Sequence, residues 1–252
     1  ANCKLQAGYE YKSGSLGFFA LTEGIKPDQA YSNCLVDFAQ KGDLMLTDLG
    51  YFKLSVFQQI TAKGAYFLSK LLIGTTLLNA DTSEKIDLRA TLRSFVGNTL
   101  EMNVIMGNDK HPVPCRLIGF RATKQIADTR RRKLRKEAKK KGRTPSKNHL
   151  ALCDWTLFVT NAPSEILPVT IVFSLYRLRW QIELIFKQLK SVLRIHSSHT
   201  AKEYRLKCEI LGKLIMAVII HSIHSSLNAT LWTTRKKEVS FDKLYKRIQE
   251  RA

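Results

Sequence analysis

A strand–helix–strand pattern near the start of the chain constrains its fold most. Residues 43–47 form a short apolar run suited to a buried strand, which stops at Asp48. Ser55 can cap a helix over residues 56–62, and residues 65–72 then show a second strand pattern. This order indicates an α/β sheet and places Asp48 at the carboxyl end of a strand, where ligand chemistry gathers. A turn or helix-cap role is the alternative for this Asp.

The rest of the chain alternates strand and helix patterns. Residues 4–11 and 16–22 flank a Ser-Gly-Ser turn and predict a β-hairpin. Residues 73–122 hold several short strand patterns separated by Gly, Asn and Pro turns. Two long helices are expected over residues 170–193 and 202–227. The predicted fold class is α/β.

The formal net charge of +20 indicates a polyanionic partner, with nucleic acid as the first candidate. A basic membrane-surface protein is the alternative. Residues 130–143 alone contain ten basic residues and one acid. They lack a sustained apolar face, so we expect a solvated helix or loop there. Two roles remain open for it: contact with the DNA backbone, or a mobile solvated tract.

Cysteine usage and hydropathy suit a cytoplasmic protein. The five cysteines lie far apart and form no Cys-x-x-Cys pair, which favours reduced thiols over a disulfide framework. The longest apolar stretch, residues 211–220, is interrupted by Lys213 and is too short for a membrane span. We therefore expect no membrane partner.

Four side chains in the first long predicted helix carry the chemical signal. At about 100° per residue, Tyr176, Arg179, Glu183 and Lys190 fall within about 60° of each other on one helix face. One reading is a salt-bridged surface, because Arg179 and Glu183 are four residues apart. The other reading is a carboxylate metal ligand flanked by groups that bind phosphate.

The spacing of these four residues resembles the signature of the IS4 group of bacterial insertion-sequence transposases. That signature is Tyr, two residues, Arg, three residues, Glu, six residues and Lys, and the chain matches it without a gap. Residues 46–51, which contain Asp48, resemble the family segment that carries the second catalytic Asp. Further segments that look similar are 4–22, 130–143 and 159–161.

The resemblance implies an RNase H-like fold, a mixed sheet flanked by helices, with a β-rich insertion between Asp48 and Glu183. We expect a first part of this core at residues 1–72, lacking its first strand. The insertion then spans residues 73–154, with a basic tract at 124–147. The second part of the core follows at 155–232, and a basic tail at 233–252.

The resemblance also implies a catalytic mechanism of DNA transposition. A triad of two Asp and one Glu would hold two Mg²⁺ or Mn²⁺ ions for DNA cleavage at transposon ends and joining to target DNA. Asp48 and Glu183 would be the catalytic metal ligands. Arg179 and Lys190 would hold phosphates, and Tyr176 would hydrogen-bond a phosphate near the cut. A homodimer bridging two DNA ends is the implied assembly.

Further DNA contacts are expected outside this motif. The four cations that begin the basic stretch would contact the DNA backbone without reading sequence; they are Arg130, Arg131, Arg132 and Lys133. Trp155 lies 21 residues before Tyr176, where a relative places a Trp that stacks on a flipped base. A core aromatic at the start of a strand is the alternative for Trp155.

One catalytic residue of the family has no match in this sequence. The family's first catalytic Asp ends a strand just before the hairpin, and this chain begins at the hairpin. Asp28, Asp37 and Asp43 are not placed to substitute for it. We therefore expect this stretch alone to be inactive, either because it is part of a longer enzyme or because it is a remnant that only binds DNA or inhibits. A basic RNA-binding module would explain the charge but not the motif.

Overall fold

The computed structural model describes residues 3–191, 193–195, 197 and 202–250, and these form two compact units. One unit contains residues 28–177, and the other contains the described residues of 3–27 and 178–250. Their boundaries do not coincide with the segment boundaries expected from the sequence, because the sheet described below joins strands from several of those segments.

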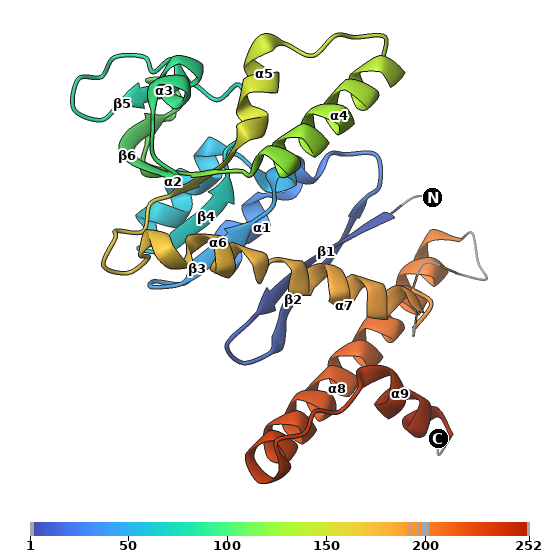
Figure 1. Ribbon diagram of the computed structural model, residues 1–252. Helices are drawn as coiled ribbons and strands as arrows, with labels where there is room; N and C mark the ends of the chain where they lie inside the picture. Colours follow the sequence, from blue (N-terminus) through green and yellow to red (C-terminus); the bar gives the residue numbers. More distant parts are fainter. Residues whose placement is uncertain (1–2, 192, 196, 198–201, 251–252) are drawn as a thin grey trace. The chain divides into compact units, whose positions relative to one another are not determined.

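The unit of residues 28–177 contains a mixed sheet with helices, shown in blue to yellow in Figure 1. Its elements in chain order are η1 (Asp28–Tyr31), α1 (Asn33–Phe38), β3 (Leu44–Thr47), η2 (Leu49–Tyr51), α2 (Leu54–Ala62), β4 (Tyr66–Lys70), β5 (Leu77–Asn79), α3 (Leu88–Ser94), β6 (Thr99–Met106), β7 (Val113–Arg121), α4 (Lys124–Lys140), α5 (Lys147–Ala151), η3 (Leu152–Asp154), β8 (Trp155–Thr160) and α6 (Val169–Arg177).

Among the described residues the sheet has six strands in the order β3-β4-β8-β7-β6-β5. β3 and β4 are parallel, and every other neighbouring pair is antiparallel. The predicted strand–helix–strand order is confirmed as β3, α2 and β4. The predicted α/β class is confirmed as a mixed α/β unit. Strands β5, β6 and β7, predicted to form an insertion, extend the same sheet.

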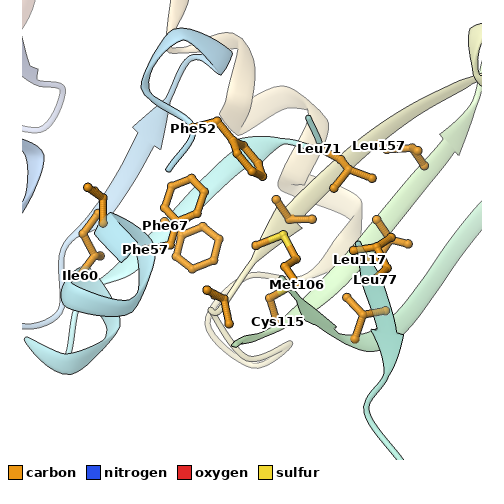
Figure 2. Packing of buried hydrophobic residues seen from close by; sticks show 14 of the residues in the cluster. Phe52, Phe57, Ile60, Phe67, Leu71, Leu77, Met106, Cys115, Leu117 and Leu157 are labelled. Atoms are coloured by element: carbon orange, nitrogen blue, oxygen red, sulfur yellow. The ribbon is translucent and has the colours of Figure 1, made fainter. Parts of the chain in front are cut away.

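One face of the sheet is covered by α2, which begins at Leu54. Val56, Phe57 and Ile60 are fully buried. In Figure 2 the ring of Phe57 stacks on Phe67 of β4, with centroids 4.3 Å apart. Burying one such side chain contributes about 1.5–3 kcal/mol. The predicted cap at Ser55 is wrong: Lys53 occupies the N-cap without a side-chain hydrogen bond, and this buried face fixes the helix instead.

The opposite face of the sheet is covered by α6. Because successive side chains of a strand point to opposite faces, Leu68 and Phe158 turn away from α2 and join a second cluster. Val172 and Tyr176 of α6 pack in that cluster and are buried. The packing of α6 therefore fixes where the Tyr176 side chain lies relative to β3 and β4.

The second unit packs helices against the predicted hairpin, which is confirmed. Its elements are β1 (Cys3–Glu10), β2 (Ser15–Glu23), α7 (Trp180–Ser191), α8 (Glu203–Arg235) and α9 (Phe241–Gln249). Ile185 and Leu189 of α7 are buried in one cluster with Ile220 of α8 and Phe241 of α9. Phe19 of β2 packs against that cluster, so the hairpin supplies part of this unit's core.

Helix α8 is longer than the sequence predicts. It has 33 residues, and by length and composition alone it is long and apolar enough to cross a membrane. The prediction that the apolar segment here is too short for a membrane span is therefore wrong. Only 22% of its apolar window is buried. Long core helices of soluble proteins meet the same criterion, so this property assigns no membrane role.

Candidate functional site

Asp48 lies at the carboxyl end of β3, as predicted. Its backbone is extended, and the 3-10 turn η2 follows it directly. β3 and β4 run parallel in the register Leu46 with Leu68 and Thr47 with Ser69, so both strands end at the same edge of the sheet. The Asp48 side chain is exposed there. A carboxylate in this position can accept a cation or a hydrogen-bond donor from solvent.

Tyr176 reaches the same edge from α6. Its hydroxyl donates a hydrogen bond to the backbone carbonyl oxygen of Thr47 at 3.1 Å, and the residue is only 6% exposed. The ring meets Phe158 edge-on, with centroids 5.0 Å apart. The ammonium of Lys70 lies 5.7 Å from the ring centroid. Tyr176 therefore joins the strand that ends in Asp48 to its neighbour β4 and to α6.

The four-residue row predicted on one continuous helix is wrong in its geometry. α6 ends at Arg177 and α7 begins at Trp180, and hydrogen bonds over three residues replace the regular helix between them. Neither Gly nor Pro marks the break in the sequence. The two helices bury their apolar faces in different clusters, Tyr176 in one and Ile185 in the other, and this packing interrupts the helix.

The remaining three residues of the motif belong to the second unit: Arg179 lies just before α7, Glu183 lies in its first turn and Lys190 in its last turn. The guanidinium of Arg179 donates to the Glu183 carboxylate at 2.7 Å, and the two side chains are 19% and 38% exposed. Glu183 and Lys190 also line an open hollow of about 640 Å³, together with Phe186, Lys187 and Ser191. The motif thus forms a carboxylate flanked by cations on an accessible helix face.

Sequence reasoning missed Lys187. It is exposed and lines the same hollow. The signal was available, because Lys187 follows Glu183 by four residues and precedes Lys190 by three, which places all three on neighbouring positions of one face. This face therefore offers two ammonium groups beside the Glu183 carboxylate.

Sequence reasoning also missed the polar surroundings of the loop after Asp48. Burial and the charges of Asp28, Cys34 and Asp48 raise the pKa of Tyr51, which stays protonated at neutral pH. Asp28 packs against the same loop, where a side chain at Gly50 would meet its carboxylate at 3.4 Å. Only the contact between η1 and η2 brings Asp28 close, because the two elements are far apart in sequence.

Trp155 lies in the core rather than on a binding surface. It is 5% exposed and belongs to the cluster under α2. The guanidinium of Arg121 sits 4.6 Å from its ring centroid, and Phe95 meets the ring at 6.0 Å. A base could stack on Trp155 only after these groups moved, so the structure favours the alternative of a core aromatic.

The first two predicted DNA-binding arginines are used inside the fold. Arg130 donates to the carbonyl oxygen of Trp155 at 3.0 Å and to the Thr156 hydroxyl at 2.8 Å. Arg131 forms ion pairs with Asp128 and Asp154, and its hydrogen bond to Asp154 raises its pKa. These hydrogen bonds and ion pairs anchor α4 to η3 and β8. Ala127 is the one buried residue among the described residues of α4, so apolar packing contributes little to that anchor.

The later cations of α4 are exposed. Arg132 and Lys133 are exposed, with only weak contacts at 3.4 Å to Thr129 and 4.0 Å to Glu137. The exposed cations that follow on the helix are Arg135, Lys136, Lys139 and Lys140. Like charges four residues apart destabilise a helix by about 0.2–0.5 kcal/mol per pair. A polyanion on this face would relieve that repulsion.

The donor chemistry of Asp48 and Glu183 fits a divalent cation such as Mg²⁺. Both offer the hard carboxylate oxygens that Mg²⁺ prefers, and neither is buried. Within the part of the chain that the structure describes, no three His, Cys, Asp or Glu side chains gather as a metal-binding group. Asp48 belongs to one unit and Glu183 to the other. Mg²⁺ is often held by one or two carboxylates together with water and substrate phosphates, so each of these carboxylates suits such an ion.

Comparison with known proteins defines the class. Over residues 1–219 the chain matches the family described as the transposase DDE domain. That match covers most of its length, so the chain belongs to the DDE transposase domain family. The resemblance predicted from the motifs is thereby confirmed.

The individual relatives are transposases of bacterial insertion sequences. The chain is 30% identical to the transposase for insertion sequence element IS231F of Bacillus thuringiensis subsp. israelensis, and 31% identical to that for IS231D of subsp. finitimus. Each alignment covers 99% of this chain and 56% of the relative. The transposase for IS1151 of Clostridium perfringens is 29% identical, with 95% and 54% covered. The chain thus spans about half the length of these relatives.

Proposed function

We propose that this chain contributes the catalytic domain of a DNA transposase, with an RNase H-like arrangement of its sheet and helices. One observation carries the proposal. The hydroxyl of Tyr176, the first residue of the motif, binds the carbonyl of Thr47, directly before Asp48, although 129 residues separate the two in sequence. This contact joins the first residue of the motif to the strand end that carries Asp48, the proposed second catalytic Asp.

Asp48 and Glu183 are the proposed ligands of Mg²⁺ or Mn²⁺. When bound, two such ions supply an activated water or 3′-hydroxyl and stabilise the leaving oxygen of the cleaved strand. The side chains of this chain would hold the ions and orient the reacting groups of the DNA. Before DNA binds, Arg179 neutralises the Glu183 carboxylate; once DNA binds, its planar guanidinium can grip a phosphate instead.

The proposed substrate is DNA, in keeping with relatives named for insertion sequence elements. Lys187 and Lys190 would bind backbone phosphates beside Glu183, and the exposed cations of α4 would bind the backbone elsewhere. The proposed reaction cleaves the ends of an element and joins them to target DNA. A homodimer that holds both ends is the assembly we propose for it.

The basic helix provides a prediction that separates anchoring from DNA contact. Arg130→Ala should lower the free energy of unfolding by about 1–2 kcal/mol, because it removes hydrogen bonds to partly buried acceptors of β8. Arg132→Ala and Lys136→Ala should change it by less than about 0.5 kcal/mol. Each of these two variants should instead lower the slope of log affinity for DNA against log salt by the amount expected for about one phosphate contact. Urea unfolding measures the change in stability, and DNA titrations at several salt concentrations measure the change in DNA binding. A stability loss in Arg132→Ala and Lys136→Ala, with a change in DNA binding alone in Arg130→Ala, would contradict these assignments.

The function is tested with the protein expressed from its complete reading frame. The substrate is a linear duplex that carries the DNA flanking the gene, incubated with Mg²⁺, with Mn²⁺ or with EDTA. We expect nicks at defined positions near the element ends with either metal and none with EDTA, while DNA binding persists in EDTA. Binding without nicking would favour the non-catalytic alternative. Equal affinity for RNA of similar length would favour an RNA-binding module.

A further inference from the structure

We propose that Lys70 is a phosphate-binding residue of the same site. This inference rests on the proposed function and adds a residue outside the motif. β3 and β4 pair in the parallel register Leu46 with Leu68 and Thr47 with Ser69. One step further along both strands places Lys70 beside Asp48, at the shared carboxyl edge of the sheet.

Side-chain direction places the two residues on the same face. Leu46 and Leu68 both belong to the cluster beneath α6 that contains Tyr176. Because side chains alternate along a strand, the residues two positions later point the same way. Asp48 and Lys70 therefore share the α6 face, and both are exposed.

Tyr176 ties the arrangement together. Its hydroxyl binds the Thr47 carbonyl at 3.1 Å, and the Lys70 ammonium lies 5.7 Å from its ring centroid. The long Lys70 stem can thus run along the phenol ring. Asp48, Tyr176 and Lys70, from three separate segments, thus lie at one edge of the sheet.

The common structural reason for an exposed strand lysine does not apply to Lys70. Lysines protect the outer strands of sheets from pairing with other chains. β4 is an interior strand, bonded to β3 on one side and to β8 on the other. Lysine is depleted in strands, and edge protection does not account for the charge at this strand end.

The chemistry of the reaction calls for a cation in this place. A DNA strand brought to the Asp48 carboxylate carries phosphates of the same sign of charge. An ammonium beside that carboxylate offsets the repulsion and donates up to three hydrogen bonds to phosphate oxygens. Lys70 would therefore hold a phosphate of the strand that is cut next to Asp48.

The test uses Lys70→Ala, Lys70→Met and Lys70→Arg in the protein from the complete reading frame. The control is Lys110→Ala, an exposed lysine in the turn between β6 and β7. Antiparallel pairing of β7 with β8, and of β8 with β4, puts that turn at the opposite edge of the sheet. Binding to end DNA is measured in EDTA over a range of salt, and nicking is measured with Mg²⁺.

Loss of the charge should be visible in both measurements. The Met and Ala variants should lower the slope of log affinity against log salt by about 0.9, the value for one phosphate contact. They should also lower the nicking rate by about tenfold or more. Lys70→Arg should keep both near the wild-type values, and Lys110→Ala should change neither.

Each contrary outcome is decisive. A Lys70→Met variant with wild-type slope and nicking rate overturns the role of Lys70 while the proposed function stands. Equal losses in the Arg and Met variants would assign the effect to packing on Tyr176 and also overturn it. Wild-type protein that binds end DNA without nicking would refute the proposed cleavage, and the salt slopes would still decide on Lys70. Failure of the wild type to bind DNA would overturn both proposals.

Discussion

Replacing Asp48 or Glu183 by Ala is expected to lower the nicking rate by about 10⁴-fold or more, the loss seen when one member of a catalytic unit is removed. Each carboxylate would hold metal in the transition state, and neither alone would suffice. DNA affinity in EDTA should stay within about twofold, because the proposed backbone contacts come from cations that both variants retain. Single-turnover nicking with Mg²⁺ and DNA titration in EDTA measure the two effects.

Two acidic residues provide matched controls. Asp81 is an exposed Asp in the turn after β5. Glu209 makes an ion pair with Lys213 at 2.8 Å, with the same spacing of four residues as the pair of Arg179 and Glu183. Ala at either control position should leave nicking unchanged. If Glu183→Ala nicks at the wild-type rate while its control behaves as expected, Glu183 is not a metal ligand.

The largest expected loss of stability comes from Arg116→Ala, which should lower the free energy of unfolding by about 3 kcal/mol. Arg116 is 8% exposed in β7, and its guanidinium binds the Glu101 carboxylate of β6. Its remaining donor group reaches the carbonyl oxygens of Ala162 at 2.8 Å and Leu167 at 3.0 Å. Ala would leave these carbonyls without a donor in a region closed to water.

This clamp also bears on the site. The two carbonyls belong to the segment between β8 and α6, the helix that carries Tyr176. Hydrogen-exchange protection of the β7 and β8 amides reports the stability of this unit by itself. Arg116→Lys should lose less than Ala, because it keeps the charge but not the fork of donors. Arg93→Ala, at an exposed position, is the control. Unchanged protection in Arg116→Ala would show that the clamp contributes nothing to stability.

The local elements of the site could be predicted because their signals are short-range. The apolar run before Asp48 predicts β3, and the pattern at residues 65–72 predicts β4, since burial on both faces selects such runs. The spacing of four residues between Arg179 and Glu183 predicts the ion pair that the two side chains form. Family membership followed from the same residues.

Other features could not be predicted, because they depend on which surface each element packs against. No residue type marks the break between α6 and α7; it arises where the two helices join different cores. Likewise, the sequence does not separate Arg130, which anchors α4, from Arg132, which stays exposed. The difference comes from the acceptors that η3 and β8 present to one side of α4.

The sequence by itself determined the kind of protein and its candidate acidic and basic residues, because residue type and spacing express their chemistry locally. Only the tertiary structure decided that Tyr176 turns inward to the Thr47 carbonyl and that Thr47 pairs with Ser69, directly before Asp48 and Lys70. Those placements depend on strand register and on helix packing against the sheet. Both arise from contacts between segments far apart along the chain, which no local pattern encodes.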